Sequence, residues 1–146
     1  MKKLIAFIAA AMISTAGFSA TGKPIIPDYV IANFQSNYKQ AADVKWEETN
    51  KFYKAEFQQF GQYLTAYFGE DGAFLGVSKN ILSSQLPLLL QFDVKKNYSN
   101  YWITDLFELA DQYDQTYYIT LENGNETLIL KSEGSEWVTF KKIAKN

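Results

Sequence analysis

The residues of this sequence that could do chemistry are mostly acidic, because the chain has no histidine and no cysteine. Asp105, Glu108, Asp111 and Asp114 recur at every third position. Carboxylates could hold a cation or act as general acid and base. The same spacing is typical of solvated positions between apolar residues, and the glycine-containing pattern of a calcium loop is absent. We therefore predict no catalytic residue and no metal site.

The missing residue types remove whole classes of reaction. Without histidine and cysteine there is no Ser-His-Asp or Cys-His machinery, no His-ligated zinc and no His or Cys ligand for haem. No glycine-rich phosphate loop is present either, so we predict a non-enzymatic protein without a cofactor. One alternative stays open, because linear spacing cannot test whether two carboxylates meet across a cleft. It is a carboxylate-dependent hydrolase or small-ligand carrier that uses a groove between two repeats.

The N-terminus predicts export. Lys2 and Lys3 precede an apolar run over residues 4–13 and then small residues up to Ala20, which is the order of a secretory signal peptide. The run is shorter than the roughly 20 residues of a membrane-spanning helix. We expect residues 1–20 to be removed, with no stable membrane insertion afterwards, and residues 21–146 to form a single domain in the periplasm or outside the cell.

The charge of the exported part disfavours nucleic acid as a partner. The chain has 14 basic residues, all of them lysine, and 16 acidic ones. Loss of Lys2 and Lys3 leaves 12 against 16, a net charge of −4. An acidic surface repels phosphate backbones, and no arginine fork is present to read them.

Hydrophobic periodicity predicts an α+β fold. From Asp28 to about Ala42, apolar residues at spacings of three and four indicate a helix. Residues 44–47, 52–60, 62–69 and 74–77 then alternate or follow turn residues, as strands do. Three or four meandering strands after one helix make a helix-plus-antiparallel-sheet unit.

A second unit of the same kind follows. Ser83 and Ser84 can cap a helix with Pro87 in its first turn and apolar residues Leu86, Leu89, Leu90 and Val94. Alternation over 117–122, 127–131 and 137–143 predicts strands, separated by turn residues. Residues 101–113 fit both a helix and a strand. We assign them to a strand because the first unit has one there.

The two units can be laid over each other at offsets of about 60 to 64 residues, which indicates an internal duplication. We place the repeats at about 27–80 and 83–143. The fold class is then a tandem repeat of a helix plus an antiparallel meander, with the helices packed on one sheet face. Chance similarity between two helix-plus-sheet segments is the other explanation.

Alternation also predicts an aromatic sheet face away from the helices. If Tyr53, Ala55 and Phe57 face the helix, other large side chains stand opposite, among polar neighbours. Tyrosine is enriched in recognition surfaces because it combines contact area with a hydroxyl. Cross-strand pairs that merely stabilise a two-sided sheet would give the same pattern. The predicted partner-binding residues are Phe52, Tyr63, Tyr67, Tyr118 and Ile129.

The sequence resembles the PepSY-like, β-lactamase-inhibitor-like family of small exported Bacteroidetes proteins. The resemblance rests on the signal peptide, on short motifs such as residues 42–46, 53–57 and 66–72, and on the repeated Leu86-Pro87 helix start. It implies helices on one side of an antiparallel sheet, with an open face that binds a protein or peptide such as an exported hydrolase. Those inhibitors carry disulfides and this chain has none, so the resemblance does not imply a role against β-lactamase.

Overall fold

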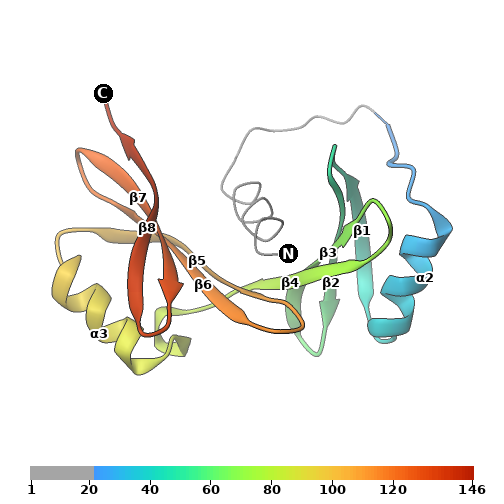
Figure 1. The fold of residues 1–146 in the computed structure, drawn as a ribbon, viewed down its shortest axis with the longest axis horizontal. Helices are drawn as coiled ribbons and strands as arrows, with labels where there is room; N and C mark the ends of the chain where they lie inside the picture. The colour runs from blue at the N-terminus through green and yellow to red at the C-terminus, as the bar shows by residue number, and fades with distance from the viewer. Residues whose placement is uncertain (1–21) are drawn as a thin grey trace. The chain divides into compact units, whose positions relative to one another are not determined.

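The computed structural model describes residues 22–146 and divides the chain into two compact units, one ending at Lys79 and the other beginning at Asn80 (Figure 1). The division falls where one predicted repeat gives way to the next. The predicted signal peptide, residues 1–20, lies outside the described part. No helix within residues 22–146 has the length and apolar character needed to cross a membrane.

The first unit is a helix followed by a four-stranded antiparallel meander. Each strand pairs with the next one along the chain, and the register of the central hairpin runs without interruption from Phe52↔Gly69 to Gln59↔Gln62. The elements are α2 (Asp28–Asn37), β1 (Ala42–Glu48), β2 (Phe52–Gln59), β3 (Gln62–Gly69) and β4 (Phe74–Asn80).

Helix α2 is shorter than its apolar spacing predicts. Pro27 precedes it with the extended backbone and fixed φ that suit a helix start, and Asp28 places a carboxylate in the first turn. The backbone leaves helical geometry at Tyr38, so the predicted end near Ala42 is wrong. The spacing misleads because Tyr38 and Ala41 still pack on the core from outside the helix.

Two turns hold the first meander in place. Phe60 and Gly61 link β2 to β3 with φ of 51° and 73°, the left-handed values of a type I′ hairpin. Gly72, between β3 and β4, has φ of 80°, and a Cβ there would lie 2.6 Å from the Tyr29 ring. Glycine is therefore required where this turn meets helix α2.

The helix packs on one face of its sheet through aromatic side chains. Val30 and Phe34 of α2 are buried against Ala55, Phe57 and other apolar residues of the strands. The Phe34 ring lies 5.0 Å from that of Phe57 in the edge-to-face arrangement that aromatic pairs favour. The helix side of the sheet is thus the core of the first unit.

The second unit repeats this topology, with a short 3₁₀ turn before its helix. Four strands again pair in chain order. Residues 102–110 form a strand, as assigned from the sequence. The elements are η1 (Ser83–Gln85), α3 (Leu88–Asn97), β5 (Trp102–Ala110), β6 (Gln115–Glu122), β7 (Glu126–Glu133) and β8 (Glu136–Ala144). The fold is therefore α+β, with antiparallel meanders and packed helices, and this prediction is confirmed.

The start and the buried face of α3 differ from the prediction. Ser83 lies in η1 and does not cap α3, which begins after Pro87 instead. Leu86 and Leu90 are buried as expected, whereas Leu89 is exposed. Periodicity could not select the face because α3 carries apolar residues around most of its circumference.

Trp137 fixes α3 to its sheet. Its indole Nε1 donates a 3.0 Å hydrogen bond to the Leu90 carbonyl oxygen, and its backbone N–H donates to the Asp93 carboxylate. The ring is buried among Leu106, Ile119 and other apolar side chains of the strands. The core of this unit, like that of the first, lies on the helix side.

Candidate functional site

The predicted binding residues of the first unit lie on the sheet face opposite helix α2. Phe52, Tyr63 and Tyr67 stand on adjacent strands with Ser78, and none of them belongs to the core cluster around Phe34. Strand alternation therefore places their side chains on the predicted face. We call Phe52, Tyr63, Tyr67 and Ser78 the helix-distal layer of the first unit.

Tyr67 is the centre of this layer. Its ring lies 5.7 Å from that of Phe52, at an interplanar angle of 72°. Its hydroxyl is 3.2 Å from Ser78 Oγ, on the neighbouring strand, with both side chains buried. Burial raises the pKa of Tyr67 to about 12, because a phenolate deprived of water is costly. Tyr67 is thus a neutral hydrogen-bonding group at physiological pH.

A network of charged side chains borders the layer. Lys54, in register with Tyr67, contacts Glu47 at 2.6 Å and Glu56 at 3.1 Å. Burial lowers the pKa of Lys54, but the hydrogen bonds to both carboxylates outweigh it and leave the pKa above its usual value. An aromatic centre with a charged rim is the arrangement found in protein interfaces.

The second unit has a matching layer. Tyr118 and Ile129 lie away from the core around Leu90, and the Phe107 ring stacks on Tyr118 at 5.1 Å and 14°. Phe140 meets the other side of Tyr118 edge to face at 5.6 Å. Burial raises the pKa of Tyr118 to about 12. The helix-distal layer of the second unit comprises Phe107, Leu109, Tyr118, Ile129 and Phe140.

Most of the predicted binding residues have little contact with water. Tyr63 is 76% exposed, but Phe52, Tyr67, Tyr118 and Ile129 are between 1% and 6% exposed. Tyr63 is therefore the accessible member of the predicted set, and the other four side chains are buried. Rings packed side by side account for part of this burial.

Three members of the second layer were not found from the sequence. Phe107 and Leu109 come from β5, which the sequence assigned to a strand by correspondence with the first unit and not by its own alternation, so its two faces were not separated. Once it is a strand, Phe107 and Leu109 alternate with Leu106 on the opposite face. Phe140 lies at a register shift between β7 and β8. Alternation within β5 was the signal that could have revealed the first two.

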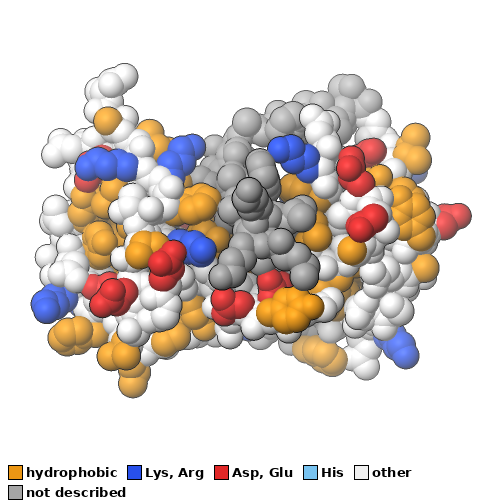
Figure 2. Space-filling view, viewed as in Figure 1, with side chains coloured by type: hydrophobic (Ala, Val, Ile, Leu, Met, Phe, Trp, Pro, Cys, Tyr) orange, Lys and Arg blue, Asp and Glu red, His pale blue; other side chains and the backbone are white. Residues whose placement is uncertain are grey.

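Large apolar side chains also reach the surface elsewhere, among charged groups (Figure 2). Phe60 is 80% exposed at the tip of the β2–β3 hairpin, three residues from Tyr63. Tyr113, in the loop between β5 and β6, is 78% exposed. Phe60 and Tyr63 thus give one end of the first unit a pair of accessible aromatic residues.

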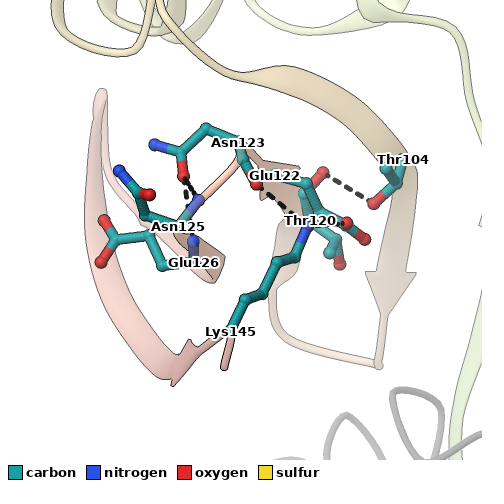
Figure 3. Close-up of polar contacts among 7 residues, drawn as sticks. All are labelled: Thr104, Thr120, Glu122, Asn123, Asn125, Glu126 and Lys145. Atoms are coloured by element: carbon teal, nitrogen blue, oxygen red, sulfur yellow. Dashed lines mark hydrogen bonds and ion pairs between the residues drawn. The ribbon is translucent and has the colours of Figure 1, made fainter.

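Glu122 and Glu126 form ion pairs with lysine residues near the C-terminus. Lys145 Nζ lies 2.7 Å from a Glu122 oxygen and 3.0 Å from the Asn123 carbonyl oxygen (Figure 3). Asn123 Oδ1 accepts hydrogen bonds from the backbone N–H groups of Asn125 and Glu126. The cluster therefore stabilises the β6–β7 turn and holds the C-terminal strand against it.

Both of these carboxyl groups have lowered pKa values, so they are ionised at neutral pH. The hydrogen bond from Lys145 lowers the pKa of Glu122, and hydrogen bonds from Lys142 and Tyr101 lower that of Glu126. A general acid at neutral pH needs the opposite shift. Within residues 22–146, no group of three or more acidic side chains is arranged to hold a metal ion.

Comparison with known proteins identifies the fold. The sequence matches no family model and no curated protein. Among solved structures, a BLIP-like protein from Bacteroides fragilis has 21% identity and a TM-score of 0.73, over 86% of this chain and 92% of that one. A DUF2874 family protein from Bacteroides ovatus has 17% identity and a TM-score of 0.71, over 83% and 89%.

A third similar structure, from Bacteroides eggerthii, is a protein of presumed periplasmic location. It has 13% identity and a TM-score of 0.71, over 83% of this chain and 90% of that one. At identities this low, the TM-scores establish a shared fold and nothing more. The fold expected from the β-lactamase-inhibitor-like resemblance is thereby confirmed, whereas no comparison shows a PepSY-like domain.

Proposed function

We propose that this protein is an exported, non-catalytic binding module that captures a protein or peptide partner, such as an exported hydrolase, through its helix-distal layers. The residues proposed to make the contact are Phe52, Tyr63, Tyr67, Tyr118 and Ile129. The periplasm or the cell exterior is the proposed location. The fold shared with a BLIP-like protein and with one of presumed periplasmic location supports both parts of the proposal.

The observation that carries the proposal is the aromatic composition of the sheet face away from the helix. When a helix covers one face of an antiparallel sheet, the other face is normally polar. Here it holds the Phe52–Tyr67 pair in one unit and the Phe107–Tyr118 stack in the other. Aromatic residues at the centre of an interface, ringed by contacts that exclude water, are the common hot spots of protein complexes.

Tyr63 is the proposed point of first contact, because it is the exposed member of the five. Its partner in register is Gln58, and Phe60 lies at the hairpin tip beside it. A partner that reaches Tyr67 or Tyr118 does so only after the groups that shield those rings move aside. We therefore propose a two-step capture, in which contact at Tyr63 precedes opening of the layer.

Site-directed photo-crosslinking tests the proposal. A benzophenone amino acid replaces Tyr63 in one sample of the exported protein and Tyr113 in another, and both are irradiated in native periplasmic extract. The two tyrosines are similarly exposed, at 76% and 78%, and Tyr113 belongs to neither helix-distal layer, so Tyr113 is a matched control. We expect a discrete crosslinked species from position 63 and none from position 113.

The identified partner then allows affinities to be measured. Tyr63→Ala should weaken its binding about tenfold or more, because truncation of an aromatic anchor costs over 1 kcal/mol. Tyr113→Ala should leave the affinity unchanged. Equal crosslinking from both positions, or full affinity in Tyr63→Ala, would contradict a binding role for this face.

A further inference from the structure

A second candidate surface lies on the helix side of the first unit, beside its outermost strand. A groove of about 450 Å³ runs between the C-terminal half of α2 and β1. Phe34, Tyr38, Val44 and Trp46 give it an apolar lining, and Gln35 and Lys39 supply its polar groups. Pockets of 300 to 1,000 Å³ with mostly apolar walls and a few polar groups are typical binding sites.

The polar groups of this groove have no partner within the described part of the chain. Neither the Gln35 amide nor the Lys39 ammonium has a hydrogen bond or ion pair with any residue in 22–146. Lys39 thus offers an uncompensated positive charge beside apolar walls. The complementary group is a carboxylate, and the walls favour an apolar side chain next to it.

Strand β1 offers an unpaired backbone along the groove. In the strand order β1 stands at one end, and among the described strands only β2 pairs with it. Thr49 N–H donates to the Phe52 carbonyl oxygen at 3.0 Å, so residue 49 turns its backbone groups toward β2. Antiparallel pairing alternates, and the N–H and C=O of Trp46 and Glu48 therefore point outward.

Trp46 belongs both to the groove and to the unpaired edge of β1. Its side chain lines the groove, and its outward backbone groups can pair with an added strand. The register of β1 shifts between Ala42 and Lys45, and Asp43 has a φ of 54°, so regular pairing is confined to residues 45–48. An added strand would thus be short and centred on Trp46.

We propose that β1 and this groove bind an extended acidic segment of a partner protein by strand addition. The segment pairs with the outward backbone groups of Trp46 and Glu48. One large apolar side chain enters the groove, and a carboxylate two residues away along the segment, on the same face, contacts Lys39. The extended form follows from the unpaired edge, and the acidic character follows from the unpartnered lysine.

This surface is independent of the helix-distal layers. It lies on the opposite sheet face, so loss of binding at Tyr63 would leave it unaffected. A second copy of the chain is the competing occupant, because an exposed edge strand can pair with itself. Sedimentation velocity separates these cases, since self-pairing produces a dimer.

The test uses a defined probe peptide and the exported protein. The peptide is seven residues long, acetylated and amidated, with threonine alternating with aspartate, phenylalanine and aspartate. It presents Asp, Phe and Asp on one face in either strand direction. Titration should change the tryptophan emission saturably. The change should persist in Trp102→Phe and disappear in Trp46→Phe.

Two matched charge reversals test the carboxylate contact. Lys39→Glu should weaken binding of the peptide at least tenfold, as should replacing both aspartates of the peptide by lysine. Lys45→Glu makes the same charge change on the opposite face of β1, and it should alter affinity less than twofold. Equal effects of Lys39→Glu and Lys45→Glu would overturn the carboxylate assignment.

N-methylation tests strand addition directly. Methyl groups on alternate peptide nitrogens block the hydrogen bonds of one edge only. One methylated set should abolish binding, and the other should leave it within threefold. Equal affinity of both sets, no saturable signal at millimolar peptide, or a dimer that excludes the peptide would each overturn the proposal.

Discussion

The pair formed by Tyr67 and Ser78 gives the sharpest test of whether the helix-distal layer is shielded from water. Both side chains are buried, at 2% and 4% exposure, and their hydroxyls are 3.2 Å apart. Tyr67→Phe removes one hydroxyl and leaves the other buried without a partner. The expected cost is about 1 to 3 kcal/mol, because desolvation of the orphaned group is no longer compensated.

Ser78→Ala should cost a similar amount, since it orphans the Tyr67 hydroxyl. The double variant Tyr67→Phe/Ser78→Ala removes both groups and should be less destabilised than the two single losses combined, by about 1 kcal/mol. Urea unfolding followed by circular dichroism gives each free energy of unfolding. The matched control is Tyr63→Phe, on the same strand, which should change stability by less than about 0.5 kcal/mol.

Water access would produce the opposite pattern. If the face is open, solvent satisfies whichever hydroxyl remains, and the single variants cost almost nothing. Losses that are near zero and strictly additive would therefore refute the burial of Tyr67 and restore a freely accessible binding face.

Two further predictions concern the first unit. The folded state holds the pKa of Tyr67 at about 12 against 10.0 when unfolded, so unfolded chains lose the proton first as pH rises. Stability should fall between pH 10 and pH 12 by up to about 3 kcal/mol from Tyr67 alone, and urea midpoints in that window should drop less in Tyr67→Phe. Phe60→Asn should raise the free energy of unfolding by about 0.5 to 1 kcal/mol, because asparagine tolerates the left-handed φ of 51° better than an aromatic residue does. A lower urea midpoint for Phe60→Asn would indicate contacts that the exposure of the ring does not reveal.

The strands were predictable because local signals agree. Gly61 and Gly72 mark turns that need a positive φ, and alternation on both sides of them assigns each side chain to a face. Helix limits were less predictable. Tyr38 and Ala41 continue the apolar spacing of α2 because loop residues fill the same core.

The sequence predicted which sheet face carries the candidate site, but not how much of that face is exposed. Alternation placed Tyr67 and Tyr118 on the face away from the helices, since it depends only on neighbours along the strand. Exposure depends on what lies across that face, which periodicity does not encode. Phe107 was missed because its segment also fits helical spacing, and the strand there was assigned from the first unit without separating its two faces.

The two units share a topology but secure their helices by different contacts. Tyr29 and Asn33 of α2 donate hydrogen bonds to the carbonyl oxygens of Glu70 and Gly72, in the turn after β3. Helix α3 instead accepts hydrogen bonds from Trp137 at the start of β8. The helices are therefore not interchangeable parts. A chimera with α2 in both positions would place Tyr29 and Asn33 opposite a turn other than the one they bond to, and would remove the Asp93 carboxylate that accepts a hydrogen bond from the Trp137 backbone N–H.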